Sequence, residues 1–461
     1  MQQYSFNLPY QSPERVFAAF ADDPFALFFD SSSKDSPQSR YSFIALNPLE
    51  TLITRDKTTT IRNGDLELSF TRNPFDMLQS RLNLWKDEIT FIKNPGVPFT
   101  GGAAGMFGYD LARHLEKLPQ PVDAGAATPD MAVGIYTQVI AFDLRARKSW
   151  FFAISNSEDT ADDAYQNIVT QLAIIQPASP HLNWQSPKTH STYKDDIAAV
   201  IEHIHAGDIF QANLSRQFSA PLPQGFSPYA HYLFLRNVNP APFAAYMNFG
   251  DFQISCSSPE RFLQVTDGHI ETRPIKGTAP DSDDPARLEQ NGKDRAENIM
   301  IVDLMRNDLS RVCTPESVDV TSLCKVETYA GLHHLVSAVE GTLTPGKTAI
   351  DALTACFPGG SITGAPKLRA MEIIAEHEPV RRGPYCGSLG YVGFDGAMDT
   401  NIVIRTLVYK DNIARFNTGG GIVAQSNVED EYRETLIKAR KIFESFAAEE
   451  EIVPIRRENV A

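Results

Sequence analysis

Hydrophobic and polar residues alternate in short runs along the first part of the chain. Residues 41–46, 67–70 and 132–142 show this alternation and are rich in β-branched and aromatic side chains. A period of two residues is typical of strands that bury one face. The pattern therefore predicts strands of an antiparallel sheet before about residue 176.

Beyond residue 190 the hydrophobic period switches repeatedly between that of a helix and that of a strand. Hydrophobic residues at helical spacing predict helices over 193–205, 293–309 and 429–446. A mixed α/β chain, with large sheets faced by helices, is the predicted fold class. Strands are predicted in this half at 209–218, 243–249, 254–257, 387–394 and 402–409.

A polar stretch with several prolines, between residues 175 and 192, breaks every periodic pattern. The main boundary is predicted there. It separates an N-terminal region, 1–176, from a C-terminal region, 190–448, that carries the candidate chemistry. We expect the two regions to interlock in one globule.

Composition narrows the class of protein. The chain has 461 residues, 42% of them hydrophobic, which is enough for a large core, and a formal net charge of −15. No Lys/Arg block suggests nucleic-acid binding, and no hydrophobic segment is long enough to span a membrane. The five cysteines form no C-x-x-C pair, which argues against zinc and disulfides. We expect a soluble cytoplasmic protein with small-molecule ligands.

Carboxylates fall beside the hydrophobic stripes of two predicted helices. Glu297 lies one turn before Ile301 on the stripe of 293–309, while Glu431, Glu434 and Lys438 follow one edge of the last helix. Two carboxylates from separate helices, completed by water, are a common holder for Mg²⁺. Helical spacing equally allows an arginine partner for Glu297 and an ordinary surface bridge between Glu434 and Lys438.

Two glycine-rich segments and two loop charges are further candidates. Residues 359–367 lead into a predicted helix and resemble an anion cradle, whereas the glycines at 419–421 fit either a ligand approach or a plain turn. Glu260 and Lys276 each follow a predicted strand. As solvated loop charges they would be inert, but in a closed pocket burial would turn them into a general acid and a nucleophilic amine.

Taken together, these segments resemble the chorismate-utilising enzymes over nearly the whole chain. That resemblance implies large antiparallel sheets packed face to face and flanked by helices. The matching motifs lie at 101–110, 258–262, 274–278, 294–298, 302–308, 333–337, 359–367, 404–406, 419–421 and 431–435.

The resemblance also implies roles for single residues. Glu297 and Glu434 would hold Mg²⁺, with Glu431 acting directly or through water, and Glu260 would help the C4 hydroxyl of chorismate to leave. The residues that it places on the substrate carboxylates are Tyr385, Arg405, the Gly421 backbone and Lys438, and those near the ring are Thr278 and His334.

Two positions distinguish reactions within the family. Gln211 stands where water-using relatives carry a lysine base, and glutamine cannot serve as that base. Lys276 matches the aminodeoxychorismate synthases, where anthranilate synthases usually have alanine. The resemblance thus implies that the Lys276 amine bonds to C2 before ammonia adds at C4, giving 4-amino-4-deoxychorismate for p-aminobenzoate and folate synthesis. Lys276 would need a lowered pKa to be neutral near pH 7.

The sequence shows no glutaminase region, so a separate class I glutamine amidotransferase is expected to supply ammonia. Residues 28–32 only loosely match the family's tryptophan pocket, which leaves tryptophan as an open ligand. Two alternatives remain: an anthranilate synthase component I, and a non-catalytic subunit that senses tryptophan or binds the amidotransferase.

Overall fold

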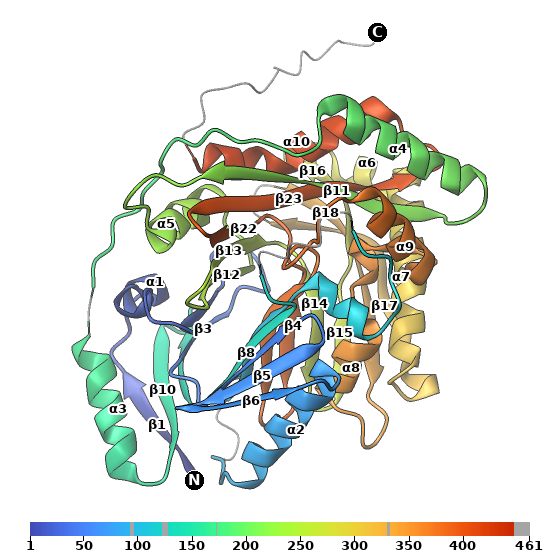
Figure 1. The fold of residues 1–461 in the computed structure, drawn as a ribbon. Helices are drawn as coiled ribbons and strands as arrows, with labels where there is room; N and C mark the ends of the chain where they lie inside the picture. Colours follow the sequence, from blue (N-terminus) through green and yellow to red (C-terminus); the bar gives the residue numbers. More distant parts are fainter. Residues whose placement is uncertain (93–95, 122–127, 172, 330–331, 447–461) are drawn as a thin grey trace.

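The computed structural model describes residues 1–92, 96–121, 128–171, 173–329 and 332–446, and two large antiparallel sheets organise this part of the chain (Figure 1). The 11-stranded sheet contains, in spatial order, β1 (Gln2–Leu8), β10 (Lys148–Ser155), β9 (Gln138–Asp143), β3 (Tyr41–Leu46), β2 (Leu27–Asp30), β12 (Phe243–Asn248), β13 (Gln253–Ser258), β22 (Thr406–Lys410), β23 (Ile413–Val423), β11 (Gln211–Pro221) and β19 (Gly364–Ala365).

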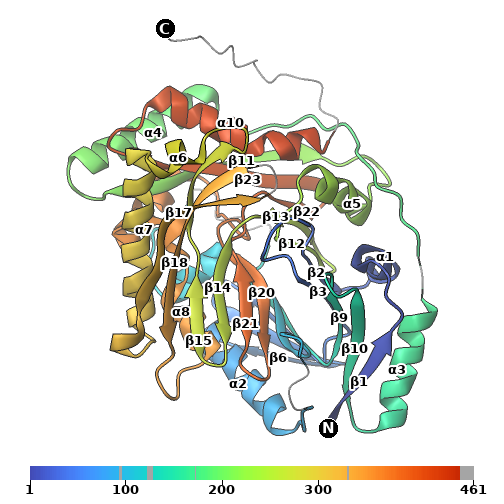
Figure 2. The same ribbon diagram turned by 180° about the vertical axis from the view of Figure 1, so that it is seen from behind.

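The second sheet is 12-stranded and bends around the other side of the core (Figure 2). It contains β16 (Ile275–Pro280), β18 (Leu332–Thr342), β15 (His269–Thr272), β14 (Arg261–Thr266), β21 (Met398–Asn401), β20 (Ser388–Gly393), β7 (Gly102–Phe107), β8 (Met131–Tyr136), β4 (Glu50–Arg55), β5 (Thr58–Asn63) and β6 (Leu66–Phe70), with β17 (Asp319–Tyr329) paired to β18.

Helices cover the outer faces of both sheets. They are α1 (Pro13–Phe17), α2 (Pro74–Asp87), α3 (Glu158–Thr170), α4 (His190–His205), α5 (Pro228–Val238), α6 (Pro285–Glu289), α7 (Gly292–Ser310), α8 (Ala349–Cys356), α9 (Lys367–His377) and α10 (Val428–Glu444). The inner faces pack against each other through hydrophobic residues such as Phe43 of β3 and Met106 of β7. Helices α1, α3 and α5 bury the outer face of the first sheet, and α2, α7 and α8 that of the second. The predicted fold class is confirmed.

Strands from both halves of the sequence share each sheet. β2 pairs with β12 in the first sheet, and β7 pairs with β20 in the second. Residues 173–189, which connect the halves, contain no helix or strand. Pairing across the boundary buries both regions against each other, because neither completes a sheet alone.

One predicted strand is wrong in an instructive way. Residues 132–142 form two strands, β8 and β9, which separate at Thr137 and enter different sheets. Both strands are almost entirely buried, so their hydrophobic residues run on without a polar break. Such continuous burial hides a change of sheet from any reading of periodicity.

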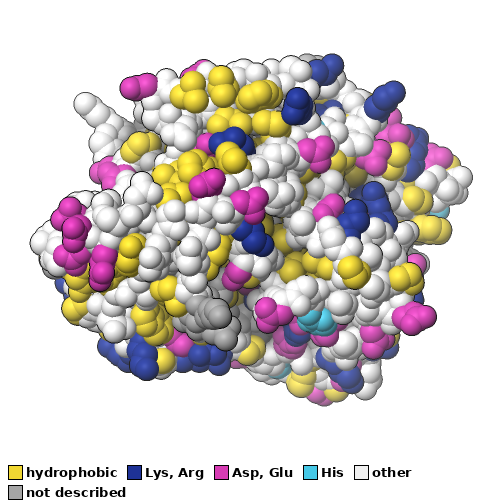
Figure 3. All heavy atoms as spheres, turned by 90° about the horizontal axis from the view of Figure 1, so that it is seen from below, with side chains coloured by type: hydrophobic (Ala, Val, Ile, Leu, Met, Phe, Trp, Pro, Cys, Tyr) yellow, Lys and Arg dark blue, Asp and Glu magenta, His cyan; other side chains and the backbone are white. Residues whose placement is uncertain are grey.

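The surface carries mixed charge. Figure 3 shows acidic, basic and hydrophobic side chains interspersed over the face seen from below. Within the described ranges, no helix is both long and apolar enough to cross a membrane.

Candidate active site

The side chain of Glu297, on α7, contacts residues from two strands, β16 and β11. Its Oε1 atom accepts a hydrogen bond from Lys276 Nζ of β16 at 2.7 Å and another from Gln211 Nε2 of β11 at 2.9 Å. Lys276 and Glu297 have side chains only 12% and 13% exposed. A carboxylate that is held by two donors in a nearly closed environment has a fixed orientation, as a ligand-binding group requires.

The glycines at 419–421 lie inside β23, and not in a turn before the last helix as one prediction allowed. A Cβ atom at Gly421 would lie 2.7 Å from Glu297 Oε1, and one at Gly420 would lie 3.3 Å from both Glu431 Oε2 and Glu434 Oε1. Three carboxylates from α7 and α10 therefore border the same short piece of backbone. A Cβ atom at Gly421 would come too close to Glu297, whereas one at Gly420 would make a tight contact with the other two carboxylates.

Helix α10 presents a different face to the core than its hydrophobic spacing predicts. The hydrophobic spacing of this helix predicts that Tyr432, Leu436, Ala439 and Phe443 are buried. Ala439 is buried, but the other three are only half-buried, whereas Glu431 is 3% exposed. These three hydrophobic residues contact the neighbouring helices and strands instead. Helix α10 is thus rotated about its own axis relative to the orientation that its hydrophobic spacing predicts. This rotation turns Glu431 toward β23 and places a carboxylate on the buried side of the helix.

Each of the three carboxylates has a lysine partner. Beside the Glu297–Lys276 pair, Lys293 Nζ lies 3.5 Å from Glu431 Oε1, and Lys438 Nζ lies 2.6 Å from Glu434 Oε1. Ser426 also donates a hydrogen bond to Glu431 Oε1 at 2.6 Å. Glu431 Oε2, in contrast, is buried with no hydrogen-bond partner among the described residues. Burial raises the pKa of this carboxyl group.

The pKa of Lys276 departs from the prediction. Burial lowers it, but the negative charge and hydrogen bond of Glu297 outweigh burial and hold the pKa of Lys276 above its ordinary value. The expected lowering is therefore wrong for this structure. The sequence pattern could not show that Glu297 contacts the amine directly.

Glu260 directly precedes β14 and is buried, with 6% of its surface exposed. Burial raises the pKa of this carboxyl group above its ordinary value, against hydrogen bonds from Ser361 and the Ile275 backbone and the positive charge of Lys276. The direction agrees with the prediction for a closed pocket. A raised pKa is the direction that a carboxyl group needs for general-acid catalysis.

The glycine-rich segment 359–367 supports Glu260 and is not an open anion cradle. Gly360 begins a short 3₁₀ helix, Gly360–Ile362, and Gly364 pairs with β11. A Cβ atom at Gly364 would lie 2.1 Å from the Gln211 carbonyl oxygen, so the glycine is needed for close backbone packing. Residues 359–365 are buried, and they place Ser361 against Glu260.

A buried ion pair that the sequence analysis missed secures this segment. Arg382 and Glu378 pair at 2.7 Å with side chains 2% and 6% exposed. Arg382 also donates to the carbonyl oxygens of Ile362 and Asn213, and Glu378 accepts from the Ser215 N–H. The pair thus ties β11 to the Glu260 side of the site. Its i, i+4 spacing was a signal, but the two residues lie at the end of α9 and beyond, where helical spacing does not apply.

The predicted substrate-binding residues fall into separate groups. Lys438 donates to the Gly419 carbonyl oxygen at 3.1 Å, beside the carboxylates. His334 Nδ1 lies 3.2 Å from Thr278 Oγ1, and burial together with the charge of nearby Arg405 lowers the pKa of His334 to about 4. Tyr385 is buried, with the Arg382 guanidinium 5.8 Å from the centre of its ring.

The segment 28–32, which loosely matched a tryptophan pocket, has its polar groups engaged by the protein. Asp30 accepts hydrogen bonds from Arg236 Nε at 2.8 Å and from the Tyr232 hydroxyl at 2.9 Å. Ser31 donates to the Tyr41 carbonyl oxygen at 2.7 Å. Tryptophan binding remains a prediction.

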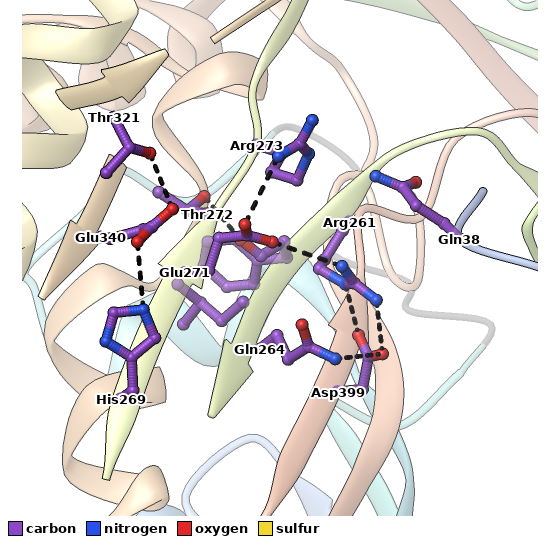
Figure 4. Close-up of polar contacts among 12 residues, drawn as sticks. Gln38, Arg261, Gln264, His269, Glu271, Thr272, Arg273, Thr321, Glu340 and Asp399 are labelled. Carbon is purple, nitrogen blue, oxygen red and sulfur yellow. Dashed lines mark hydrogen bonds and ion pairs between the residues drawn. The ribbon is translucent and has the colours of Figure 1, made fainter. Parts of the chain in front are cut away.

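A second charged cluster lies on the neighbouring strands β14, β15 and β21 (Figure 4). Arg261 binds both carboxylate oxygens of Asp399, each at 3.0 Å, and contacts Glu271 at 3.4 Å. Glu271 in turn contacts Arg273 at 3.4 Å. This cluster consists of fork-shaped guanidinium contacts of the kind that stabilise a sheet.

The donor set beside β23 fits a hard divalent cation. It consists of carboxylate oxygens, of which Glu431 Oε2 is buried and unpartnered within the described ranges. In the same ranges, no three His, Cys, Asp or Glu side chains are close enough to enclose a metal ion on their own. Mg²⁺ accepts such an arrangement, because it usually binds one or two protein carboxylates and completes its shell with water and substrate oxygens.

Comparisons with known proteins identify the family of this chain. Residues 26–444 match the family described as chorismate binding enzyme. The chain is 41% identical to aminodeoxychorismate synthase component 1 of Salmonella typhimurium, over 95% of this chain and 96% of that protein. It is 38% identical to anthranilate synthase component 1 of a Synechocystis strain, covering 93% and 92%. The crystal structure of anthranilate synthase component I from Streptococcus pneumoniae superposes with a TM-score of 0.78 at 31% identity, covering 89% of this chain and 93% of that one.

Proposed function

The chain belongs to the chorismate-binding enzymes, and from that premise we propose that it converts chorismate and ammonia to 4-amino-4-deoxychorismate. The observation that carries the proposal is Lys276, which lies 2.7 Å from Glu297 and close enough to Glu260 for the two charges to interact. Overall identity does not decide the reaction, because aminodeoxychorismate and anthranilate synthases are similar to this chain to almost the same degree. A buried lysine beside a buried acid favours C4 amination.

The proposed reaction has two displacement steps. Neutral Lys276 Nζ bonds to C2 of the ring while the C4–O bond breaks, and Glu260 gives its proton to the departing hydroxyl, which leaves as water. Ammonia then bonds to C4 while the bond between C2 and Lys276 breaks. The new ammonium group returns one proton to Glu260, so both residues regain their initial states.

Lys276 must be neutral when it attacks. Its contact with Glu297 favours the charged amine in this structure, so the lysine has to lose a proton before the first step. Glu297 and Glu434, with Glu431 acting directly or through water, are the residues that would hold Mg²⁺, which neutralises the ring carboxylate when bound.

The remaining charged and polar groups orient the substrate. Arg405 offers a bidentate fork to one carboxylate, and Lys438 and the Gly421 N–H serve the other together with Tyr385. His334 has a pKa of about 4 and is therefore neutral near pH 7, so beside Thr278 it acts near the ring as a hydrogen-bonding group without charge.

A partner completes the proposal. A class I glutamine amidotransferase would release ammonia for this chain in the cytoplasm, and the product would enter p-aminobenzoate and folate synthesis. The name "component 1" of the relatives is consistent with a second component.

The test is product analysis after incubation of the isolated chain with chorismate, Mg²⁺ and ammonium. The expected product is 4-amino-4-deoxychorismate, identified by mass and retention time. Anthranilate as the main product would replace the proposal with the anthranilate synthase reaction. No consumption of chorismate at any Mg²⁺ concentration would favour a non-catalytic subunit.

A further inference from the structure

Arg216 of β11 is a buried arginine whose guanidinium group is held by aromatic rings. The residue is 6% exposed, and its Nε and Nη1 atoms have no hydrogen-bond acceptor among the residues that the structure describes. Its Cζ atom lies 4.4 Å from the ring centre of Phe218, 5.0 Å from that of Tyr432 and 5.7 Å from that of Tyr193. A hydrophobic residue would fill this space without burying unpaired N–H groups, so the arginine points to a role beyond packing.

These three rings, the aromatic cage, belong to three different elements. Tyr193 lies on α4, Phe218 on β11 and Tyr432 on α10, and the two helices lie side by side above β11 and β23 (Figure 1). Tyr193 is fully buried, and its hydroxyl donates to the Leu214 carbonyl oxygen at 3.0 Å. Two rings of the cage are therefore fixed to the strand, and Arg216 ties the third, and with it α10, to them.

Tyr432 lies beside the carboxylates that are proposed to bind Mg²⁺. With about 100° of helical turn per residue, Tyr432 lies about 100° to one side of Glu431, and Glu434 lies about 60° to the other side. Glu431 Oε2 and Glu434 Oε1 would both lie 3.3 Å from a Cβ atom at Gly420. A contact that fixes Tyr432 thus fixes the direction in which both carboxylates point.

Helix α10 is anchored differently along its length. Ala439 and Ile442 of its second half are buried in a hydrophobic cluster, and Thr418 Oγ1 donates to the Thr435 carbonyl oxygen at 2.9 Å. The end that carries the carboxylates relies on the ring of Tyr432. A rotation of about 20° there would move an atom about 5 Å from the helix axis by about 2 Å. The tolerance of a metal–oxygen distance is about 0.2 Å, so a small rotation is enough to weaken the site.

We infer that Arg216 is a positioning residue, which fixes the rotation of α10 through Tyr432 and thereby sets the affinity of Glu431 and Glu434 for Mg²⁺. The inference rests on the metal binding of the proposed function. The charge of Arg216 alone would have the opposite effect, because a cation near the carboxylates repels Mg²⁺ and its removal would tighten binding. The direction of the change therefore distinguishes positioning from electrostatics.

The experiment titrates Mg²⁺ into the full chain without chorismate and measures the heat of binding. Methionine in Arg216→Met keeps a long side chain but has no charge to place over the rings. The Kd for Mg²⁺ should rise about 10-fold, as is typical when a group that orients a metal ligand is removed. In Arg216→Lys it should rise only about 2- to 3-fold, because a cation still faces the rings. An unchanged or lower Kd in Arg216→Met would overturn the inference.

Arg415→Met is the matched control. Arg415 lies on β23 between Ala414 and Phe416, which pack in the hydrophobic cluster under α10, so its own side chain points to the opposite face of the sheet. Its Nη1 atom donates to the Lys410 carbonyl oxygen. The Kd for Mg²⁺ should stay within about 2-fold of the wild-type value. A rise equal to that of Arg216→Met would refute a role specific to the aromatic cage.

Two variants of Tyr432 test the ring contact directly and do so even if Arg216→Met does not fold. Tyr432→Phe keeps the ring face, so its Kd for Mg²⁺ should match the wild type, whereas Tyr432→Leu should raise it about 10-fold. In the double variant Arg216→Met with Tyr432→Leu the rise should be no larger than in either single variant, because both remove the same contact. Equal values for Tyr432→Phe and Tyr432→Leu, or additive losses in the double variant, would reject the contact.

The wild-type chain is titrated first, and its product is identified separately. Absence of Mg²⁺ binding would defeat the proposed metal site together with this inference. Binding with the same Kd in wild type, Arg216→Met and Tyr432→Leu would defeat the role of Arg216 alone. Anthranilate as the product would defeat the proposed amination, while the Kd values would still decide whether Arg216 positions α10.

Discussion

Two charged clusters begin at adjacent residues, Glu260 and Arg261, and differ in which kind of polar atom each leaves without a partner. In the cluster of Figure 4, Arg261 contacts Asp399 through two nitrogens and Glu271 through the third, and both Asp399 oxygens are used. In the candidate active site, Gln211 Oε1 and Glu431 Oε2 are buried without a partner among the described residues. In the cluster of Figure 4 the buried unpartnered atom among the described residues is a donor, Arg273 Nε, whereas the two unpartnered atoms of the candidate site are acceptors, which can receive a ligand's donor or a cation.

The two clusters also differ in the basic side chain that pairs with their carboxylates. The cluster around Asp399 uses arginine, whose planar fork fixes geometry but does not lose its proton. The active site pairs its three carboxylates with Lys276, Lys293 and Lys438. A lysine contacts its carboxylate as a single point charge, and its ammonium group can lose a proton. When it does, the carboxylate is no longer held in an ion pair and can bind another ligand.

The largest expected effect is that of Lys276→Ala. Formation of 4-amino-4-deoxychorismate should fall by about three orders of magnitude or more, because the substitution removes the proposed nucleophile. Lys325→Ala is the control, since Lys325 is an exposed lysine of β17, which β18 separates from the strand of Lys276. Rates are measured by chromatography of the product. A Lys276→Ala rate close to the wild-type value would reject the covalent route.

Glu260→Gln should reduce the rate by about 10²- to 10⁴-fold, the usual range for a general acid. Glutamine keeps the shape of the side chain but has no proton to give to the departing hydroxyl. Glu271→Gln, in the cluster of Figure 4, should leave the rate within about 2-fold. Equal losses in the two variants would mean that the clusters are not functionally distinct. Steady-state rates at saturating chorismate and ammonium decide the matter.

Asp399→Asn should have the opposite effect to Lys276→Ala and Glu260→Gln: it should lower the stability of the fold and leave the catalytic rate unchanged. Arg261 and Asp399 are 10% and 19% exposed, and Asp399→Asn leaves the buried Arg261 with the longer contact to Glu271 as its remaining carboxylate contact. The free energy of unfolding should fall by about 3 kcal/mol, as for other broken buried pairs. Denaturant unfolding measures this change. The double variant Arg261→Met with Asp399→Leu should recover part of it, and a rate per folded molecule far below wild type would place the pair in the active site.

The limits of sequence reading follow from the same two clusters. Glu297, Lys276 and the glycines at 419–421 were identified because their motifs resemble a known family, and α7 followed from a clear hydrophobic stripe. The spacing of residues did not reveal that Glu297 contacts Lys276 or that α10 is turned to bury Glu431. Both depend on how helices sit over β23, and helix rotation is decided by tertiary packing that periodicity does not contain.

The structural cluster was invisible to sequence analysis for a related reason. Arg261 and Asp399 are 138 residues apart and meet only because β14 pairs with β21. The Glu378–Arg382 pair was close in sequence but lay at and beyond the end of a helix, where spacing carries no information. Buried ion pairs that form through strand pairing can therefore be identified only from the three-dimensional structure.

The smallest expected effect concerns pH and compares a histidine of the site with one of the core. Burial, with the charge of Arg405, lowers the pKa of His334 from 6.5 to about 4, and burial lowers that of His231 from 6.5 to about 4. The unfolded chain therefore binds protons that the folded chain excludes between these values. The stability is fully present above pH 6.5 and is lost as the pH falls toward 4.

Each histidine should make the free energy of unfolding about 2 kcal/mol lower at pH 5 than at pH 7. His334→Asn should therefore flatten this pH dependence by about 2 kcal/mol, and His231→Asn by a similar amount, in urea unfolding at the two pH values. The variants should differ in catalysis, because His334 lies beside Thr278 while His231 contacts Tyr409 and the Ser445 carbonyl oxygen. A slope that His334→Asn leaves unchanged would show that His334 takes up its proton in the folded chain at the ordinary pH, and that the site is more open to water than its burial implies.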